Sequence, residues 1–144
     1  MEIVSIAVSH KKGTTKVCTD GAELIENHGI KGDAHAGDWH RQVSFLAAEQ
    51  IQRASDAGPT PLGFGAFAEN IATLGVDWKN LPIGQRVKLG ENALLEITQI
   101  GKVCHKKCAI YYRTGDCIMP KEGVFAKVLT GGSIKIGDPV ILVD

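Results

Sequence analysis

Residues 101–120, which read GKVCHKKCAIYYRTGDCIMP, bring three of the chain's four cysteines close together. Cys104, Cys108 and Cys117 share this segment with His105. The segment also carries more cations than acids. Its only acid is Asp116, and its cations are Lys102, Lys106, Lys107 and Arg113. Lysine and imidazolium neighbours stabilise a thiolate, so this segment can hold a reactive cysteine. The same cations can attract an anionic or phosphorylated ligand.

Two other interpretations of the cysteine segment stay open on spacing alone. One is a structural zinc site of the Cys₃His kind, from Cys104, His105, Cys108 and Cys117. Against it, the usual zinc knuckle has a Cys-x-x-Cys pair, whereas three residues separate Cys104 from Cys108. Adjacent Cys104 and His105 would also have difficulty reaching one ion from a strand. The other interpretation is that Cys108 and Cys117 are ordinary buried thiols and the lysines form a solvated face.

A second polar segment, residues 29–44, reads GIKGDAHAGDWHRQVS and places Asp33, His35 and Arg41 in a loop before an expected strand. Its three glycines let the backbone adopt positive φ and approach a ligand closely. Such a loop suits recognition of a polar heterocycle or a phosphate, or it is a surface loop whose Asp and His side chains cap turns. A metal site at His35 and His40 is a weak hypothesis, because two loop histidines define no geometry.

Two further positions could contribute to a site. Glu69 and Asn70 interrupt an apolar stretch, and a buried pair of this kind needs hydrogen-bond partners. Either they satisfy backbone groups at a bend, or Asn70 lines a pocket. Arg86 ends the stretch LPIGQR and is either a phosphate-facing cation or a surface strand residue.

Composition limits the classes of protein. The 144 residues carry 16 Lys+Arg and 16 Asp+Glu, and zero net charge argues against a general nucleic-acid binder or a polybasic membrane-surface protein. No apolar run approaches the ~20 residues of a spanning helix, and the first residues do not resemble a signal peptide. We therefore expect a soluble, cytoplasmic protein whose cysteines, including Cys18, are thiols.

The elements expected to position these residues are mostly short strands. β-branched runs closed by turn residues predict strands at 3–8, 42–46, 86–89, 93–100, 134–136 and 140–143. Residues 86–89 and 94–100 around Gly-Glu-Asn predict a hairpin. Helices are expected at 47–57, before Gly-Pro, and at 122–129, before Gly-Gly. The fold class is therefore mainly β, one domain with a few short helices.

Several stretches together resemble the MOSC domain, named for the C-terminal part of molybdenum-cofactor sulfurases. In family order and over nearly the whole chain they are GIKGDAHAG, RQVSFL, FAENIATL, LPIGQRVKL, LEITQIGKVCHKKC, GDCIMPKEGVFAKV and residues 131–140. The resemblance implies a single MOSC-like β-barrel domain over residues 1–144, similar to the small stand-alone bacterial members.

The resemblance also implies a link to molybdenum cofactor, a phosphorylated pyranopterin dithiolene that bears molybdenum. It assigns Cys104 as molybdenum ligand or sulfur (persulfide) carrier, with Cys108 as second candidate because one residue more separates the two thiols than in the Cys-x-x-Cys relatives. Asp33, His35 and Asn70 would face the pterin. The phosphate would meet cations, for which the candidates are Arg41, Arg86, Lys106 and Lys107. The family as a whole is also associated with pyridoxal phosphate binding.

Two activities follow from this resemblance. One is reduction of N-hydroxylated compounds with an electron-donor protein as partner. The other is sulfur transfer for metal–sulfur cluster or cofactor assembly, with a cysteine desulfurase as partner. The alternatives are a non-catalytic cofactor-binding or carrier module and a zinc-stabilised structural domain. We expect a small-molecule cofactor or substrate, and neither nucleic acid nor a membrane as partner.

Overall fold

The structure is a computed structural model that describes residues 1–12, 14–57, 63–101 and 123–143. Within these residues the elements follow in the order β1 (Glu2–Val8), β2 (Val17–Thr19), β3 (Gly21–Ile25), β4 (Gly29–Ile30), β5 (Val43–Ala47), α1 (Ala48–Ala57), β6 (Ile71–Leu74), the 3-10 helix η1 (Trp78–Asn80), β7 (Arg86–Leu89), β8 (Ala93–Ile100), β9 (Val124–Thr130), β10 (Gly132–Lys135) and β11 (Val140–Val143). The predicted mainly β fold is confirmed.

The strands form one large and one small sheet. The large sheet has the strand order β11-β7-β8-β9-β5-β6-β1-β2, and the small one has the order β10-β3-β4. Every pair in the large sheet is antiparallel except β5 with β6. A parallel pair needs a crossover connection, and α1, predicted at 47–57 and observed at Ala48–Ala57, lies in that connection.

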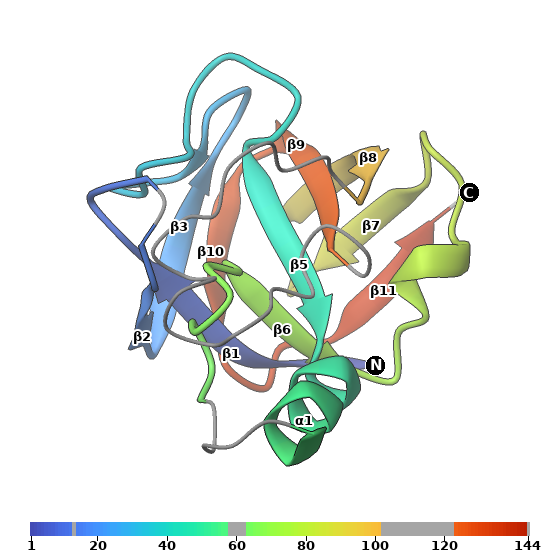
Figure 1. Ribbon diagram of the computed structural model, residues 1–144. Coiled ribbons are helices and arrows are strands. Elements are labelled where there is room, and N and C mark those ends of the chain that lie inside the picture. Colours follow the sequence, from blue (N-terminus) through green and yellow to red (C-terminus); the bar gives the residue numbers. More distant parts are fainter. Residues whose placement is uncertain (13, 58–62, 102–122, 144) are drawn as a thin grey trace.

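The large sheet curls until its ends approach each other, with α1 below it in Figure 1. The backbone N–H of Ile3 in β1 donates to the carbonyl of Asp138 at 2.9 Å, and Gly137 N–H donates back to Ile3 at 2.8 Å. At the start of β11, the N–H of Val140 donates to the carbonyl of Met1 at 3.0 Å. These bonds join the N-terminal end of the chain, including β1, to the start of β11 and the turn before it.

The main core lies inside this curled sheet, where side chains from both sheets meet. Phe45 of β5 packs against Trp78 of η1 with ring centroids 4.6 Å apart. A smaller cluster on the opposite face of β5 contains Leu46 together with Ile51 of α1. β5 is therefore buried on both faces, which explains why its residues VSFLA are almost all apolar.

The helix predicted at 122–129 is wrong, because the structure places the strand β9 at Val124–Thr130. Ala, Lys and Leu favour a helix locally, but β9 pairs with β5 on one side and β8 on the other. Val124, Ala126 and Val128 enter the main core, whereas Phe125 enters the smaller cluster. Burial on both faces thus overrides the local preference. Of the few short helices expected, α1 and the single turn η1 occur in the described residues.

The predicted hairpin is confirmed. β7 and β8 pair antiparallel with Leu89 opposite Ala93, and Gly90 takes a φ of 64° in the turn between them. Glycine adopts this left-handed conformation without the steric cost that a Cβ carries. No helix in the described part of the chain is both long and apolar enough to cross a lipid bilayer.

Candidate functional site

Three loops that are far apart in sequence meet beside β1 and β6. They are the β1–β2 connection (residues 9–16), the β4–β5 connection (31–42) and the segment 63–70 before β6. Ala34 N–H donates to the carbonyl of Ser9 at 2.7 Å, and Lys16 N–H donates to that of Gly65 at 2.9 Å. Main-chain bonds therefore hold the three loops together.

Lys16 and Asp33 form a buried ion pair at the centre of these loops. The Lys16 Nζ lies 2.7 Å from Asp33 Oδ1, and both side chains are fully inaccessible to solvent. Asp33 Oδ1 also accepts the backbone N–H of Ser9 at 3.1 Å. Lys16 Nζ further donates to Ser9 Oγ at 3.1 Å. A lysine that sequence analysis did not single out is therefore the counter-charge of the predicted site residue Asp33.

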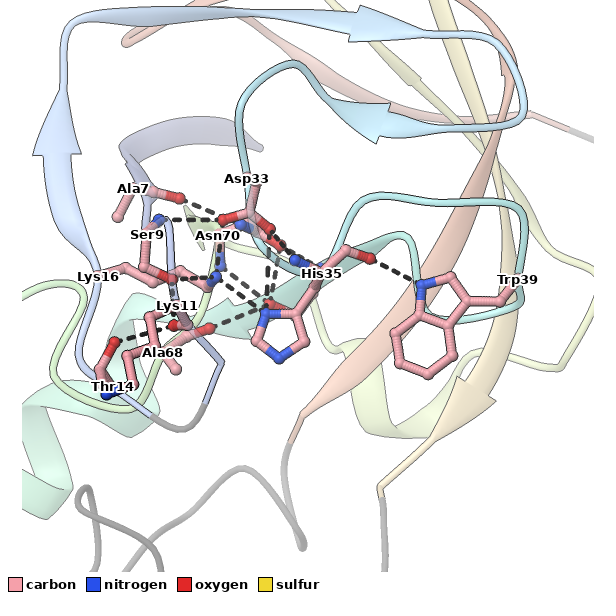
Figure 2. Close-up of polar contacts among 11 residues, drawn as sticks. Ala7, Ser9, Lys11, Thr14, Lys16, Asp33, His35, Trp39, Ala68 and Asn70 are labelled. Atoms are coloured by element: carbon pink, nitrogen blue, oxygen red, sulfur yellow. Dashed lines mark hydrogen bonds and ion pairs between the residues drawn. The ribbon is translucent and has the colours of Figure 1, made fainter.

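His35 is the third member of this cluster, as Figure 2 shows. Its Nδ1 lies 3.1 Å from Lys16 Nζ, and its backbone N–H donates to Asp33 Oδ2 at 3.1 Å. The carbonyl of His35 accepts the indole N–H of Trp39 at 2.7 Å. The side chain is only partly buried. Asp33 thus sits beneath the loop, whereas His35 lies at its surface.

The pKa of each of the three buried charged groups, Lys16, Asp33 and Glu69, departs from its usual value. Burial lowers the pKa of Lys16, although the Asp33 and Glu69 carboxylates oppose the shift. Burial alone would raise the pKa of Asp33, but the Lys16 ammonium and the Ser9 N–H together hold it below its usual range. Burial raises the pKa of Glu69 despite its hydrogen bonds with backbone N–H groups.

Glu69 shapes the bend before β6. Its carboxylate accepts the N–H of Gly65 at 2.6 Å and the N–H of Phe67 at 3.2 Å. Gly65 has a φ of 87°, and a Cβ built there would lie 2.2 Å from the carbonyl oxygen of Lys16. The expectation that Glu69 satisfies backbone groups at a bend is confirmed.

Asn70 joins β1, β5 and β6 through its side-chain amide. Its Oδ1 accepts the N–H of Ser44 at 2.9 Å and the hydroxyl of Ser44 at 3.1 Å, and its Nδ2 donates to Ala7 at 3.1 Å. Its side chain is buried. The expectation that this residue also satisfies backbone groups is confirmed, so its role in positioning the strands is visible without any ligand.

Arg41 contrasts with this cluster because no carboxylate faces it among the described residues. The guanidinium carbon lies 4.7 Å from the ring centroid of Trp39 and 5.7 Å from that of Phe125. The Nζ of Lys12 lies 5.0 Å from the same Trp39 ring. The Arg41 Nε is buried and has no hydrogen-bond partner within the described structure. A buried N–H without an acceptor is costly, so an acceptor from outside the described residues would stabilise this site.

The described residues on either side of the cysteine segment lie near this arginine. Gly101 N–H donates to the carbonyl of Gly123 at 2.6 Å, so the two described residues that flank the cysteine segment are hydrogen-bonded to each other. Gln99, two residues before Gly101, accepts a hydrogen bond from His40 Nε2 through its Oε1 at 2.9 Å. The Thr98 hydroxyl also donates to the carbonyl of His40. The neighbour of Arg41 in sequence is thus bound to the strand that leads into the cysteine segment.

The predicted residues of that segment lie outside the described residues. They are Cys104, His105, Lys106, Lys107, Cys108 and Cys117. Within the described ranges, no three His, Cys, Asp or Glu side chains form a group that could hold a metal ion.

Arg86 lies in a different part of the sheet from the other candidates. It is exposed in β7, where its Cα pairs with Glu96 of β8 and Val143 of β11. β8 and β9 separate β7 from β5, which follows directly after Arg41. The structure therefore brings together Asp33, His35, Asn70 and the Arg41 loop, but not Arg86.

An apolar hollow lies elsewhere, next to α1. It has a volume of about 650 Å³ and is lined by residues that include Val4, Ile51, Phe64 and Leu74. Glu49 is its only ionisable lining residue. It therefore lacks the cations and imidazole that mark the three meeting loops.

The chain resembles known proteins both in sequence and in fold. The chain is 27% identical over 141 residues to a protein named "Reductase" from Gibberella moniliformis (strain M3125 / FGSC 7600). The match covers 87% of this chain and 24% of the relative, so the chain spans about a quarter of that curated relative's length.

Solved structures share the fold at low sequence identity. YiiM from Geobacillus stearothermophilus superposes with a TM-score of 0.77 at 23% identity, covering 99% of this chain and 75% of that one. The YUAD protein from Bacillus subtilis superposes with a TM-score of 0.74 at 16% identity, covering 96% of this chain and 93% of that one.

The family model for the MOSC domain matches residues 32–141. That stretch is more than half of the 144 residues, and it contains Asp33, His35, Arg41 and the cysteine segment. The similar folds agree with this match over nearly the whole chain. This chain therefore belongs to the MOSC domain family.

Proposed function

We propose that this protein binds molybdenum cofactor beside Arg41 and His35, and uses Cys104 as the reactive thiol in the reduction of N-hydroxylated compounds. The observation that carries the proposal is the Arg41 guanidinium, which lies near the residues that flank the cysteine segment and faces no carboxylate among the described residues. A cation with a buried, unpartnered N–H suits the phosphate of the cofactor. Arg41 is favoured over Arg86 because only Arg41 adjoins the other candidates.

Further cations near Arg41 would strengthen phosphate binding. Lys12 lies on the Trp39 ring, as Arg41 does, so two cations share one aromatic side chain. Lys106 and Lys107 of the cysteine segment would add to this field. The indole N–H of Trp39 donates a hydrogen bond to the carbonyl of His35, which ties the ring that both cations contact to the His35 backbone.

The pterin would meet the imidazole of His35. Asp33 is buried, and its oxygens already accept hydrogen bonds from Lys16, Ser9 and His35. Asp33 therefore acts on a ligand through His35 rather than by direct contact. Asn70 supports the same loops from β6, because its amide is bonded to β1 and β5.

The thiol and the metal would supply the redox chemistry. Bound molybdenum supplies two-electron transfer, and a cysteine thiolate suits this metal as a ligand. Reduction of an N-hydroxylated compound, R–NHOH, to the amine R–NH₂ breaks one N–O bond. It consumes two electrons and two protons and releases water. An electron-donor protein would supply the electrons, and the similarity to a protein named reductase favours this activity.

Elemental analysis tests the proposal, on protein made in a host that synthesises molybdenum cofactor. We expect near-stoichiometric molybdenum in the unchanged protein and a loss in Cys104→Ser. Cys18→Ser is the matched control, because Cys18 lies in the edge strand β2 and should leave the metal content unchanged. The loaded protein should reduce an N-hydroxylated compound with an artificial reductant, and Cys104→Ser should not.

Other results would point to the alternatives. A persulfide on Cys104 after incubation with a cysteine desulfurase, without bound molybdenum, would indicate sulfur transfer. Bound molybdenum without turnover would indicate a carrier module. One tightly held zinc, with loss of the fold on chelation, would indicate a structural zinc domain. A folded Cys104→Ala protein with full molybdenum content would contradict the thiol's role.

A further inference from the structure

The hydrogen bonds around Lys16 specify which of its neighbours are acceptors. The hydroxyl of Ser9 donates to the carbonyl of Lys11 at 3.1 Å, so its oxygen must accept from Lys16 Nζ. Asp33 Oδ1 accepts a second N–H of Lys16 at 2.7 Å. An ammonium has three N–H donors, and the third atom within reach is His35 Nδ1 at 3.1 Å. Figure 2 shows these groups around the Lys16 side chain.

From this arrangement we infer that Lys16 is a positioning residue that holds His35 in one tautomer, unprotonated at Nδ1 and protonated at Nε2. The two ring nitrogens of histidine differ, and the hydrogen bond made by one decides where the proton sits on the other. Here Nδ1 faces a donor, so its lone pair must be available. Nε2 is then the donor nitrogen of the ring.

Asp33 does not offer an alternative acceptor for a proton on Nδ1. Its Oδ2 lies 4.0 Å from His35 Nδ1, which is beyond hydrogen-bond distance. The same oxygen accepts the backbone N–H of His35 at 3.1 Å. A proton on Nδ1 would therefore face the Lys16 ammonium.

The opposite assignment, in which a neutral Lys16 amine accepts a hydrogen bond from a protonated Nδ1, conflicts with the buried Asp33 carboxylate. Both Lys16 and Asp33 side chains are inaccessible to solvent. A neutral amine would leave the Asp33 carboxylate buried without its counter-charge, which is strongly unfavourable. Glu69, a second carboxylate near Lys16, adds to the field that favours the ammonium.

This inference deepens the proposed function, and it depends on that function only for the identity of the ligand. A ring protonated at Nε2 binds a hydrogen-bond acceptor, such as a carbonyl oxygen or an unprotonated ring nitrogen of a pterin. It does not suit an N–H group of the ligand. Lys16, which has no access to solvent, would thereby determine which edge of a heterocycle the site accepts.

Long-range ¹H–¹⁵N correlation NMR on protein labelled with ¹⁵N-histidine, without cofactor and near neutral pH, tests this directly. We expect the His35 signals to show an unprotonated Nδ1 and a protonated Nε2, with His35→Gln used to assign them. His40 is the internal reference. Gln99 Nε2 donates to the carbonyl of Gly101 at 2.7 Å, so Gln99 Oε1 must accept from His40 Nε2. A protonated Nδ1 on His35 in the unchanged protein would overturn the inference.

Lys16→Met tests the role of the lysine. We expect a mixture of the two His35 tautomers in this variant, whereas His40 keeps its pattern. If Lys16→Met does not fold, the double variant Lys16→Met/Asp33→Asn removes the stranded carboxylate and serves instead. A single Nε2-protonated form in the folded variant would show that Lys16 does not hold the tautomer. Because no cofactor is present, failure here leaves the proposed function untouched, and absent molybdenum leaves the tautomer result untouched.

Discussion

The buried cluster of Lys16, Asp33 and Asn70 differs from the neighbouring Arg41–Trp39 pair in how its polar groups are hydrogen-bonded. In the buried cluster, charge meets charge and each side chain has internal hydrogen-bond partners. Arg41 instead lies against aromatic rings with no carboxylate beside it in the described residues, and its Nε has no partner there. The polar groups of the first cluster are therefore satisfied by one another, whereas the second leaves a buried N–H without an acceptor in the described part of the chain.

We therefore expect the buried cluster to contribute chiefly to stability and the Arg41–Trp39 pair chiefly to ligand binding. Breaking a buried ion pair leaves an uncompensated charge and is costly. Removing a partly exposed cation that has no ion-pair partner costs little, because only its contacts with the rings are lost. Variants of the two regions should accordingly differ in whether they change unfolding or ligand binding.

Lys16→Met should have the largest effect on stability. It leaves the Asp33 carboxylate without its counter-charge and removes the hydrogen-bond donor to Ser9 and His35. We expect a loss of about 3–5 kcal/mol in the free energy of unfolding, measured by urea denaturation. The loss in Lys16→Met/Asp33→Asn should be smaller than the sum of the two single losses. A loss under about 1 kcal/mol would show that the pair behaves like a surface salt bridge.

Asn70→Ala should come next. It leaves the N–H of Ser44 and the carbonyl of Ala7 without their side-chain partner. Each stranded buried group costs about 1–3 kcal/mol, so we expect roughly 2–4 kcal/mol in total by the same denaturation measurement. Asn80→Ala is a matched control, because Asn80 is exposed and bonds to Asp77 within one turn. Equal losses in the two variants would contradict the strand-joining role of Asn70.

Arg41→Met should change stability by only about 0.5–1 kcal/mol, the value of an exposed cation–aromatic contact. Its effect on binding should be larger. A charge-assisted hydrogen bond contributes about 1.5–3 kcal/mol, so cofactor affinity should fall roughly 10- to 100-fold. Molybdenum retained after dialysis measures this loss. Arg86→Met is the control and should retain the metal, since Arg86 lies in β7. Equal retention in both variants would remove Arg41 from the site.

Six of the eleven strands in the described residues, β1, β5, β7, β8, β10 and β11, could be predicted from the sequence, because their signals are local. The short strands β2, β3, β4 and β6 were not predicted. The hairpin of β7 and β8 follows from two apolar runs around Gly-Glu-Asn, and α1 follows from its polar stretch before Gly-Pro. β9 could not be predicted in this way. Its residues VFAKVLT favour a helix as much as a strand, and only pairing with β5 and β8 decides between them.

The candidate site was accessible from sequence only where its residues are neighbours along the chain. Asp33, His35 and Arg41 fall within one glycine-rich loop, so their proximity is a local property. Lys16 was missed because nothing near it in sequence marks it as buried. Its partner Asp33 is 17 residues away, and a lone lysine between Thr15 and Val17 is most often exposed. A tertiary contact alone makes it the centre of the cluster.

The smallest expected effect concerns two carboxyl groups that both lie near Lys16 but respond to pH in opposite directions. The pKa of Asp33 is held below 3.8, so its contribution to stability is present above that pH and is lost as the pH falls through the folded-state value. Burial raises the pKa of Glu69 above 4.5, so its contribution is complete below that pH and is lost as the pH rises through the folded-state value.

The stability difference between the unchanged protein and Asp33→Asn should therefore shrink on acidification below pH 3.8, whereas the difference for Glu69→Gln should be largest below pH 4.5 and decline above it. Thermal unfolding of all three proteins across the acid range measures both differences. Opposite slopes would show that the Lys16 ammonium stabilises chiefly the Asp33 carboxylate, whereas burial outweighs the hydrogen bonds of Glu69. Slopes of the same sign would mean that Lys16 is shared between both carboxylates, so that the ion pair seen here would not be the unit that supports His35.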